Sequence, residues 1–205
     1  MSVAHIEILV EEPSMERALQ LIVPKIIGDL SFRIYPHQCK QDLLASLPAR
    51  LRGYAAWLPA DYRVVVIVDR DNDDCEDLKA QLEQAANDVG LITKTRADGQ
   101  EYRVVNRLAI EELEAWFFGD WQAVQTAYPG VNPNIPHKAG YRDPDAVLGG
   151  TWEAFERVLQ RARYFKTGLR KIEAAQAVAQ YMDPGNNRSR SFQVFREALT
   201  ELAAT

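Results

Sequence analysis

The chain has 205 residues, of which 47% are hydrophobic and 26% are charged, and this composition describes a globular protein that can bury a core. With 9% aromatic residues, 11 glycines and 10 prolines it is neither collagen-like nor disordered, and no apolar run approaches the roughly 18 residues of a membrane-spanning helix. The net charge of −5 is uneven, because residues 150–205 hold nine Lys or Arg and only six Asp or Glu. Such a basic region is a weak indication of a polyanionic partner.

Strand-like and helix-like segments alternate over the first hundred residues. We predict strands at residues 5–10, 31–35, 63–68, 91–95 and 102–106, and helices from Pro13, over 41–56 and over 73–89. Pro48 predicts an interruption of the second helix. The continuous β-branched run VVVIV is typical of a strand buried on both faces, hence central in a parallel sheet. The expected class is therefore α/β, with a small, mainly parallel sheet flanked by helices.

The rest of the chain is predicted to be mostly helical. Residues 109–128 have a helical pattern, whereas 129–150 are rich in proline and glycine and are expected to form a long loop. Three further helices are predicted over 151–164, 169–182 and 191–203. We therefore expect an α/β domain over residues 1–128 and a helical C-terminal lobe over 151–205 that packs on it. The first residues resemble a strand and not a signal peptide, so we expect a cytoplasmic protein without membrane association.

The buried central strand ends in a run of acidic residues. Asp69 and Asp71 are two positions apart, so in an extended chain both carboxylates would leave on the same side. Two facing carboxylates repel each other unless a proton, an arginine or a metal lies between them, and oxygen ligands at this spacing suit Mg²⁺ or Mn²⁺. A salt bridge to a nearby arginine is the structural alternative. Asp73 and Asp74 are interpreted mainly as caps of the following helix.

Two other segments carry acidic residues of interest. Glu11 follows the first strand and would project toward the same edge of the sheet, whereas Glu12 precedes a helix, whose dipole favours an anion there anyway. On a helical wheel Glu114 falls on the apolar face between Phe117 and Phe118. Because a carboxylate is costly to bury alone, this position requires an arginine or a metal.

Acidic residues at two strand ends and on a later helix suit metal-assisted phosphoryl chemistry. Basic side chains near such a site would hold a phosphate backbone, although each is also explained as an ordinary surface charge. The candidates are Lys40, Arg70, the acid-free basic run of Arg157, Arg161, Arg163, Lys166, Arg170 and Lys171, and a second basic point at Arg188 and Arg190. From these we select Lys40, Arg70, Lys166, Arg170 and Arg188 as phosphate or nucleic-acid contacts. Phosphate-binding loop, nucleophile-elbow and dinucleotide-binding motifs are absent, and the two cysteines make neither a disulfide framework nor a zinc site.

Taken together, these segments resemble the uncharacterised DUF4276 family, a Toprim-like group. In chain order they are VEEPS, HQCKQDLL, VVVIVDRDNDDC, IEELEAWFFGDW, YRDPD, GGTWEAFERVLQ and NRSRSF. The resemblance implies the Toprim fold of topoisomerases, primases and overcoming-lysogenization-defect nucleases, a small parallel sheet flanked by helices that binds Mg²⁺. It also implies an ATPase partner in a phage-defence setting.

The resemblance carries over residue by residue. Glu11 matches the family's first-strand glutamate, Asp69 and Asp71 match its Asp-x-Asp, and Glu114 matches the glutamate of the Glu-Ala-Trp segment. Glu12 stands where many Toprim proteins have a glycine, and it is an additional candidate ligand.

We therefore expect a nuclease or related phosphodiester-transfer enzyme that acts on DNA or RNA with Mg²⁺ or Mn²⁺. In this hypothesis Glu11, Asp69 and Asp71 hold the metal, and Glu114 is a further ligand or the general base. No tyrosine is placed for a covalent step of the topoisomerase type, so hydrolysis by an activated water is preferred. One alternative is a non-catalytic, metal-binding regulatory or interaction module. Another, which would use the same residues, is a small-molecule phosphatase or nucleotide-processing enzyme.

Overall fold

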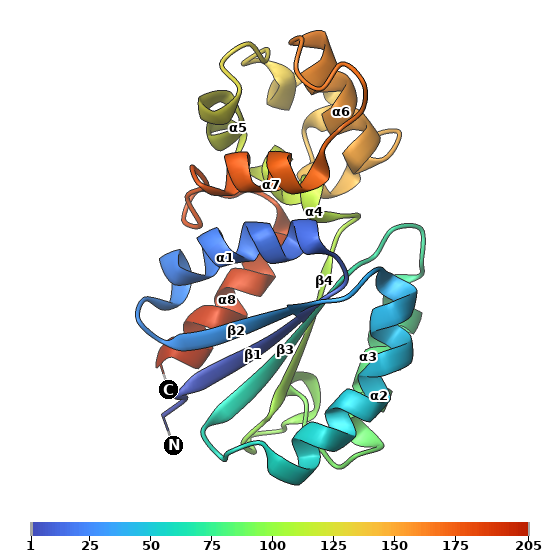
Figure 1. The fold of residues 1–205 in the computed structure, drawn as a ribbon, viewed down its shortest axis with the longest axis vertical. Helices are drawn as coiled ribbons and strands as arrows, with labels where there is room; N and C mark the ends of the chain where they lie inside the picture. Colours follow the sequence, from blue (N-terminus) through green and yellow to red (C-terminus); the bar gives the residue numbers. More distant parts are fainter. Residues whose placement is uncertain (1, 205) are drawn as a thin grey trace.

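The computed structural model, which describes residues 2–204, contains a four-stranded sheet in which every strand is parallel to its neighbours (Figure 1). The strands are β1 (His5–Val10), β2 (Ser31–Pro36), β3 (Tyr62–Asp69) and β4 (Val104–Ala109), in the order β2-β1-β3-β4. The predicted α/β class with a parallel sheet and a helical C-terminal region is confirmed. As expected from its β-branched run, β3 is an inner strand and is buried over nearly its whole length.

Helices cover both faces of this sheet. They are α1 (Pro13–Ile27), α2 (Lys40–Trp57), α3 (Cys75–Asn87), α4 (Leu113–Gly119), α5 (Trp121–Ala127), α6 (Thr151–Arg161), α7 (Lys171–Ala179) and α8 (Arg190–Ala204). Alternate residues of β3 point to opposite faces, so Val66 packs with α2 and α3, whereas Val65 packs with α1 and α8. No helix within residues 2–204 is long and apolar enough to cross a membrane.

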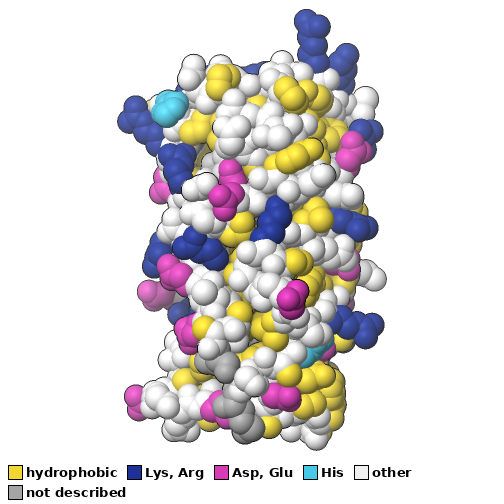
Figure 2. Space-filling model, turned by 90° about the vertical axis from the view of Figure 1, so that its left-hand side faces the viewer, with side chains coloured by type: hydrophobic (Ala, Val, Ile, Leu, Met, Phe, Trp, Pro, Cys, Tyr) yellow, Lys and Arg dark blue, Asp and Glu magenta, His cyan; other side chains and the backbone are white. Residues whose placement is uncertain are grey.

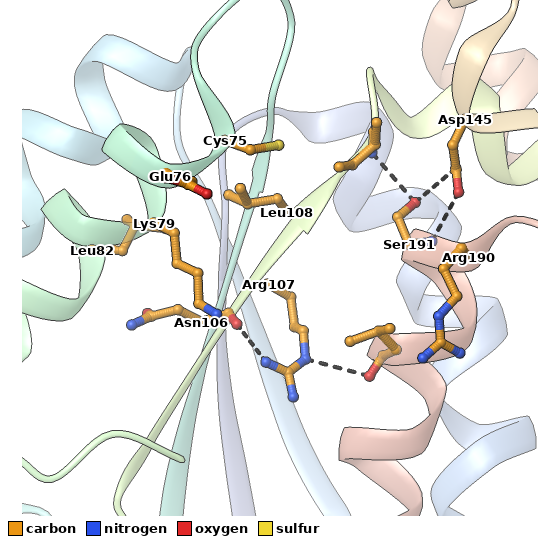
Figure 3. A pocket seen from close by; sticks show the side chains of 12 residues that line it. Cys75, Glu76, Lys79, Leu82, Asn106, Arg107, Leu108, Asp145, Arg190 and Ser191 are labelled. Carbon is orange, nitrogen blue, oxygen red and sulfur yellow. Dashed lines mark hydrogen bonds between the residues drawn. The ribbon is translucent and has the colours of Figure 1, made fainter. Parts of the chain in front are cut away.

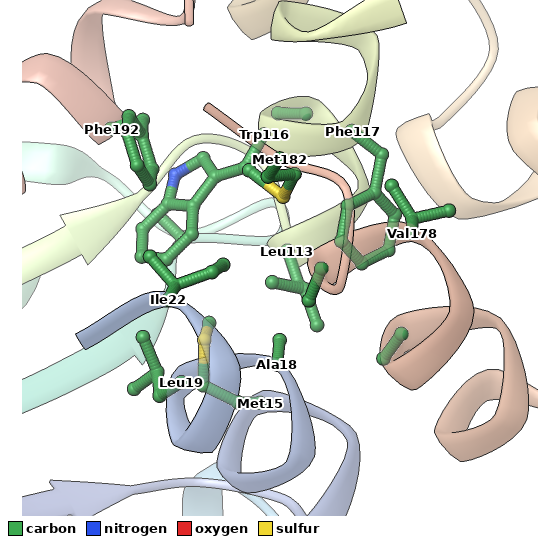
Figure 4. Packing of buried hydrophobic residues seen from close by; sticks show 14 of the residues in the cluster. Met15, Ala18, Leu19, Ile22, Leu113, Trp116, Phe117, Val178, Met182 and Phe192 are labelled. Carbon is green, nitrogen blue, oxygen red and sulfur yellow. The ribbon is translucent and has the colours of Figure 1, made fainter. Parts of the chain in front are cut away.

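The C-terminal helices share a core with the first part of the chain. Helix α7 lies along α1, and α8 packs against α1 and β4 (Figure 1). Figure 4 shows Met15 and Leu19 of α1, Trp116 of α4, Val178 of α7 and Phe192 of α8 in one apolar cluster. Residues 151–204 therefore bury apolar surface against residues 2–128 as well as against one another.

Two local predictions in the first hundred residues are wrong. Helix α2 continues through Pro48, because Leu47 and Leu51 on either side of it are buried against the sheet and offset the lost backbone hydrogen bond. Residues 91–95 do not form a strand. Only Thr93 makes an isolated bridge, to Val104, before the chain turns into the 3₁₀ helix η1 (Lys94–Arg96).

The predicted helix over residues 109–128 also differs. Ala109 ends β4, the helix begins at Leu113, and Asp120 divides it because its side chain accepts from the amide of Ala123 and caps α5. The proline-rich stretch that follows is not structureless. It contains the 3₁₀ helices η2 (Ile135–His137), η3 (Ala139–Tyr141) and η4 (Pro144–Ala146).

Candidate functional site

Two of the predicted acidic residues meet at the carboxyl edge of the sheet. Glu11 follows β1 directly, and Asp69 is the last residue of β3, which pairs with β1 in parallel. Because neighbouring parallel strands end at the same edge, their final residues come together there. The backbone N–H of Asp69 donates to Oε2 of Glu11 at 3.1 Å.

Glu114 brings a third carboxylate to this place from the first turn of α4. Glu11, Asp69 and Glu114 are only 7%, 3% and 2% exposed. Burial raises the pKa of Asp69 well above its ordinary value, and the charges of Glu11 and Glu114 raise it further. Each of these two carboxylates is thus close enough for its charge to act on Asp69. We refer to Glu11, Asp69 and Glu114 as the carboxylate cluster.

Two oxygens of the carboxylate cluster lack a hydrogen-bond partner within the described chain, namely Oδ1 of Asp69 and Oε2 of Glu114. Burial raises the pKa of Glu114 to about 7. Burial likewise raises the pKa of Glu11 to about 7, although the hydrogen bond from Asp69 opposes this rise. Buried carboxylates without partners are costly unless a proton or a cation neutralises them. The cluster therefore has an unmet requirement for positive charge.

The donor chemistry of the cluster fits a hard divalent cation, since all its side chains offer carboxylate oxygens. Among residues 2–204, however, no group of three or more His, Cys, Asp or Glu side chains is arranged so that it could hold a metal ion. The cluster would therefore have to change its arrangement before three of its side chains could hold a metal ion together.

Asp71 differs from the prediction in its backbone conformation and in its ion-pair partner. The prediction assumed an extended chain, but β3 ends at Asp69 and Asp71 has a left-handed backbone, with φ of 49°. The Asp71 carboxylate instead pairs with Nζ of Lys40 at 2.5 Å. Its charge still raises the pKa of Glu11 and of Asp69, after the larger effect of burial.

Lys40, predicted as a phosphate contact, is buried and holds the loop that follows β3. Its ammonium pairs with Asp71 and with Asp73 at 2.8 Å, and donates to the carbonyl oxygen of Arg70 at 3.0 Å. Asp73 is therefore an ion-pair partner and not a cap. The interpretation of Asp74 as a cap is confirmed, because its side chain accepts from two amides in the first turn of α3.

The other predicted basic contacts lie on the surface or in local ion pairs. Arg70 pairs with Glu111 at 3.2 Å, and Arg170 pairs with Glu173 at 2.7 Å. Lys166 and Arg188 are exposed and form no ion pair among the described residues.

Lys171, which the sequence offers only as one member of a basic run, is a cation that the fold brings to the carboxylate cluster. It is the first residue of α7, and its Nζ lies 3.9 Å from Oε1 of Glu12. Burial alone would lower the pKa of Lys171, but Glu114, Glu12, Glu112 and Asp69 together raise it above the ordinary value. No local pattern marks this lysine within the run, since it reaches the site only because α7 packs along α1.

The sequence matches the model of one protein family, described as "Domain of unknown function (DUF4276)", over residues 10–202. The chain belongs to the DUF4276 family. The matched range includes the whole carboxylate cluster, the loop held by Lys40, and Lys171. The DUF4276 chain has no match among curated proteins or among solved structures.

Proposed function

We propose that this DUF4276 protein is a nuclease or related phosphodiester hydrolase that acts on DNA or RNA with Mg²⁺ or Mn²⁺. The observation that supports the proposal is the carboxylate cluster, in which three buried carboxylates come from three different elements. Two of their oxygens have no hydrogen-bond partner within the described chain. In open α/β sheets ligands bind at this carboxyl edge, and a divalent cation would meet the cluster's requirement for positive charge.

Glu11, Asp69 and Asp71 would hold the cation, and Glu114 would be a further ligand or the general base. The Toprim-like relation of this site rests on the sequence resemblance. A divalent cation bound there would lower the pKa of a bound water and stabilise charge on phosphoryl oxygens. For Asp71 to take part, it would have to exchange its ion pair with Lys40 for the cation.

Lys171 has a role of its own in this proposal. Its ammonium offsets part of the negative charge of the cluster and can donate to a phosphate oxygen that approaches the first residues of α1 and α7. Lys40 holds the loop of Asp71 and Asp73 beside the proposed metal ligands.

We also propose that Lys166, Arg170 and Arg188 contact a nucleic-acid backbone outside the carboxylate cluster. Figure 2 shows one face of the molecule, on which Lys and Arg side chains are more frequent in the upper part, where α5, α6 and α7 lie in Figure 1. In the lower part of this face Asp and Glu side chains are more frequent than Lys and Arg. A basic surface attracts a polyanion in a salt-dependent way. An ATPase partner, a phage-defence setting and a cytoplasmic location complete the proposal and rest on the resemblance and the composition.

The test is cleavage of labelled single- and double-stranded DNA and of tRNA with Mg²⁺ or Mn²⁺. We expect cleavage that requires the metal and falls by about 100-fold or more in Asp69→Ala and in Glu114→Gln. Asp29→Asn, which changes an exposed carboxylate outside the site, is the matched control and should cleave normally. Cleavage that survives in Asp69→Ala would contradict the proposal. Metal binding without any cleavage would favour the alternative, a non-catalytic metal-binding module.

A further inference from the structure

A cavity of about 340 Å³ lies at the outer edge of the sheet, between α3, β4 and α8 (Figure 3). β4 is an edge strand, and α3 and α8 pack on it from opposite faces of the sheet. Because these helices cover the faces of the sheet and not its edge, a groove remains beside β4. Its volume falls within the range of small-molecule sites, and no member of the carboxylate cluster lines it.

Apolar side chains from all three walls form much of this edge cavity. Leu82 comes from α3, Leu108 from β4 and Val194 from α8, and Ile110 follows the end of β4. Such walls favour a ligand with an apolar body, because the transfer of apolar surface from water into the cavity is favourable.

Three cations also line the edge cavity, and none of them forms a salt bridge with a buried carboxylate among the described residues. The negative charges of Glu201, Glu83 and Glu197 act on Arg107 without contacting it in such a pair. Arg107 forms no ion pair among the described residues. Its guanidinium donates to the backbone oxygens of Asn106 at 2.7 Å and Val194 at 3.3 Å. Burial lowers the pKa of Arg107, as expected for a cation removed from water. Arg190 pairs only with the exposed Glu197, and Lys79 forms no ion pair within the described chain.

The two acidic residues that line the edge cavity, Glu76 and Asp145, form no ion pair with its cations among the described residues. Both oxygens of Asp145 already accept hydrogen bonds, from the hydroxyls of Ser189 and Ser191 and from the amide of Ser191. Glu76 is exposed at the start of α3. In Figure 3 Lys79 and Arg107 extend toward the same end of the cavity, whereas Glu76 lies near the opposite end. The cavity thus combines apolar walls with one cationic end.

We propose that the edge cavity binds a small molecule that has an apolar body and one anionic group, a carboxylate or a phosphate. The apolar body would lie against Leu82, Leu108 and Val194. The anion would pair with Lys79 and with the guanidinium N–H groups of Arg107 that the backbone does not use. This site is separate from the carboxylate cluster, and its existence does not depend on nuclease activity.

The probe for the test is the fluorescent dye 8-anilinonaphthalene-1-sulfonate, with N-phenyl-1-naphthylamine as the control that has the same rings and no charge. We expect the anionic dye to bind saturably at one molecule per chain, about 10-fold more tightly than the neutral dye. Decanoate and decyl phosphate should displace it, and the one that acts at the lower concentration identifies the anion; decanol should displace it poorly. Equal affinity for the two dyes, or no saturable binding, would overturn the proposal.

Two variants test whether the dye binds in the edge cavity. Val194→Trp fills the space and should abolish saturable binding, whereas Lys79→Gln should weaken it by about 3-fold to 10-fold. Lys79 is exposed, so this second variant keeps the test valid if Val194→Trp does not fold. Arg52→Gln removes an exposed cation of α2 and should leave dye binding unchanged. Unchanged binding in both cavity variants would place the dye elsewhere and refute the assignment.

Discussion

The acidic residues around the end of β3 fall into two sets that are neutralised differently. Glu11, Asp69 and Glu114 are buried, and two of their oxygens have no hydrogen-bond partner in the described chain. In the loop just beyond β3, Asp71 and Asp73 have side chains that are 42% and 55% exposed, and they share the ammonium of Lys40. The loop already has its cation in direct contact, whereas Lys171 and Lys40 compensate the charge of the cluster only in part. An added cation would therefore be expected to act mainly on the buried set.

The pH dependence of stability gives the largest expected difference between the two sets. Burial raises the pKa of Glu114 from 4.5 to about 7, so between these values the unfolded chain loses a proton that the folded chain keeps. Without divalent cations the free energy of unfolding should therefore fall as pH rises from 4.5 to 7, by on the order of 3 kcal/mol for this group. Glu11 acts in the same direction. Urea unfolding in EDTA should show that Glu114→Gln flattens this slope. An unchanged slope would mean that Glu114 is not a buried, proton-binding group.

The second largest difference between the two sets of acidic residues is expected in metal affinity. Asp69→Asn keeps the shape of the side chain and removes its charge, so Mn²⁺ affinity measured by calorimetry should fall by about 100-fold. Asp73→Asn is the matched change in the loop held by Lys40 and should alter the affinity by less than about 3-fold. Equal losses in the two variants would move the metal site toward the loop.

The ion pairs of the loop should affect the free energy of unfolding less than the buried carboxylates do. Lys40→Met leaves Asp71 and Asp73 without their shared cation and the carbonyl of Arg70 without its donor. Because both carboxylates are partly exposed, we expect a loss of about 1–2 kcal/mol in the free energy of unfolding. Lys166→Gln, at an exposed lysine without an ion pair in the described chain, should change it by less than about 0.5 kcal/mol. If Lys40→Met lost no more stability than Lys166→Gln, the loop would not depend on Lys40.

The smallest effect is expected at the cap of α3. Asp74→Ala removes the acceptor for the amides of Glu76 and Asp77 and should cost about 1 kcal/mol. For a chain of this size that loss lowers the melting temperature by roughly 2–4 °C. Metal affinity should not change, and a clear change would indicate that the cap and the carboxylate cluster are coupled.

Several features could be predicted because they depend on neighbouring residues. The β-branched run of β3 predicts a strand buried on both faces, and acidic residues directly after two strands predict an acidic carboxyl edge. The position of Glu114 among aromatic residues predicts its burial, even though the helix begins later than expected. These conclusions need only the two-residue period of a strand or the 3.6-residue period of a helix.

The pairing of charges was decided by the tertiary structure. The left-handed backbone of Asp71 directs its carboxylate to Lys40, and the packing of α7 along α1 brings Lys171 to the carboxylate cluster. The edge cavity likewise exists only because α3 and α8 meet β4 from opposite faces. Side-chain periodicity is a local property that the order of residues determines. A cation's partner and a cavity's walls depend on elements that are far apart in the chain and are brought together only by packing.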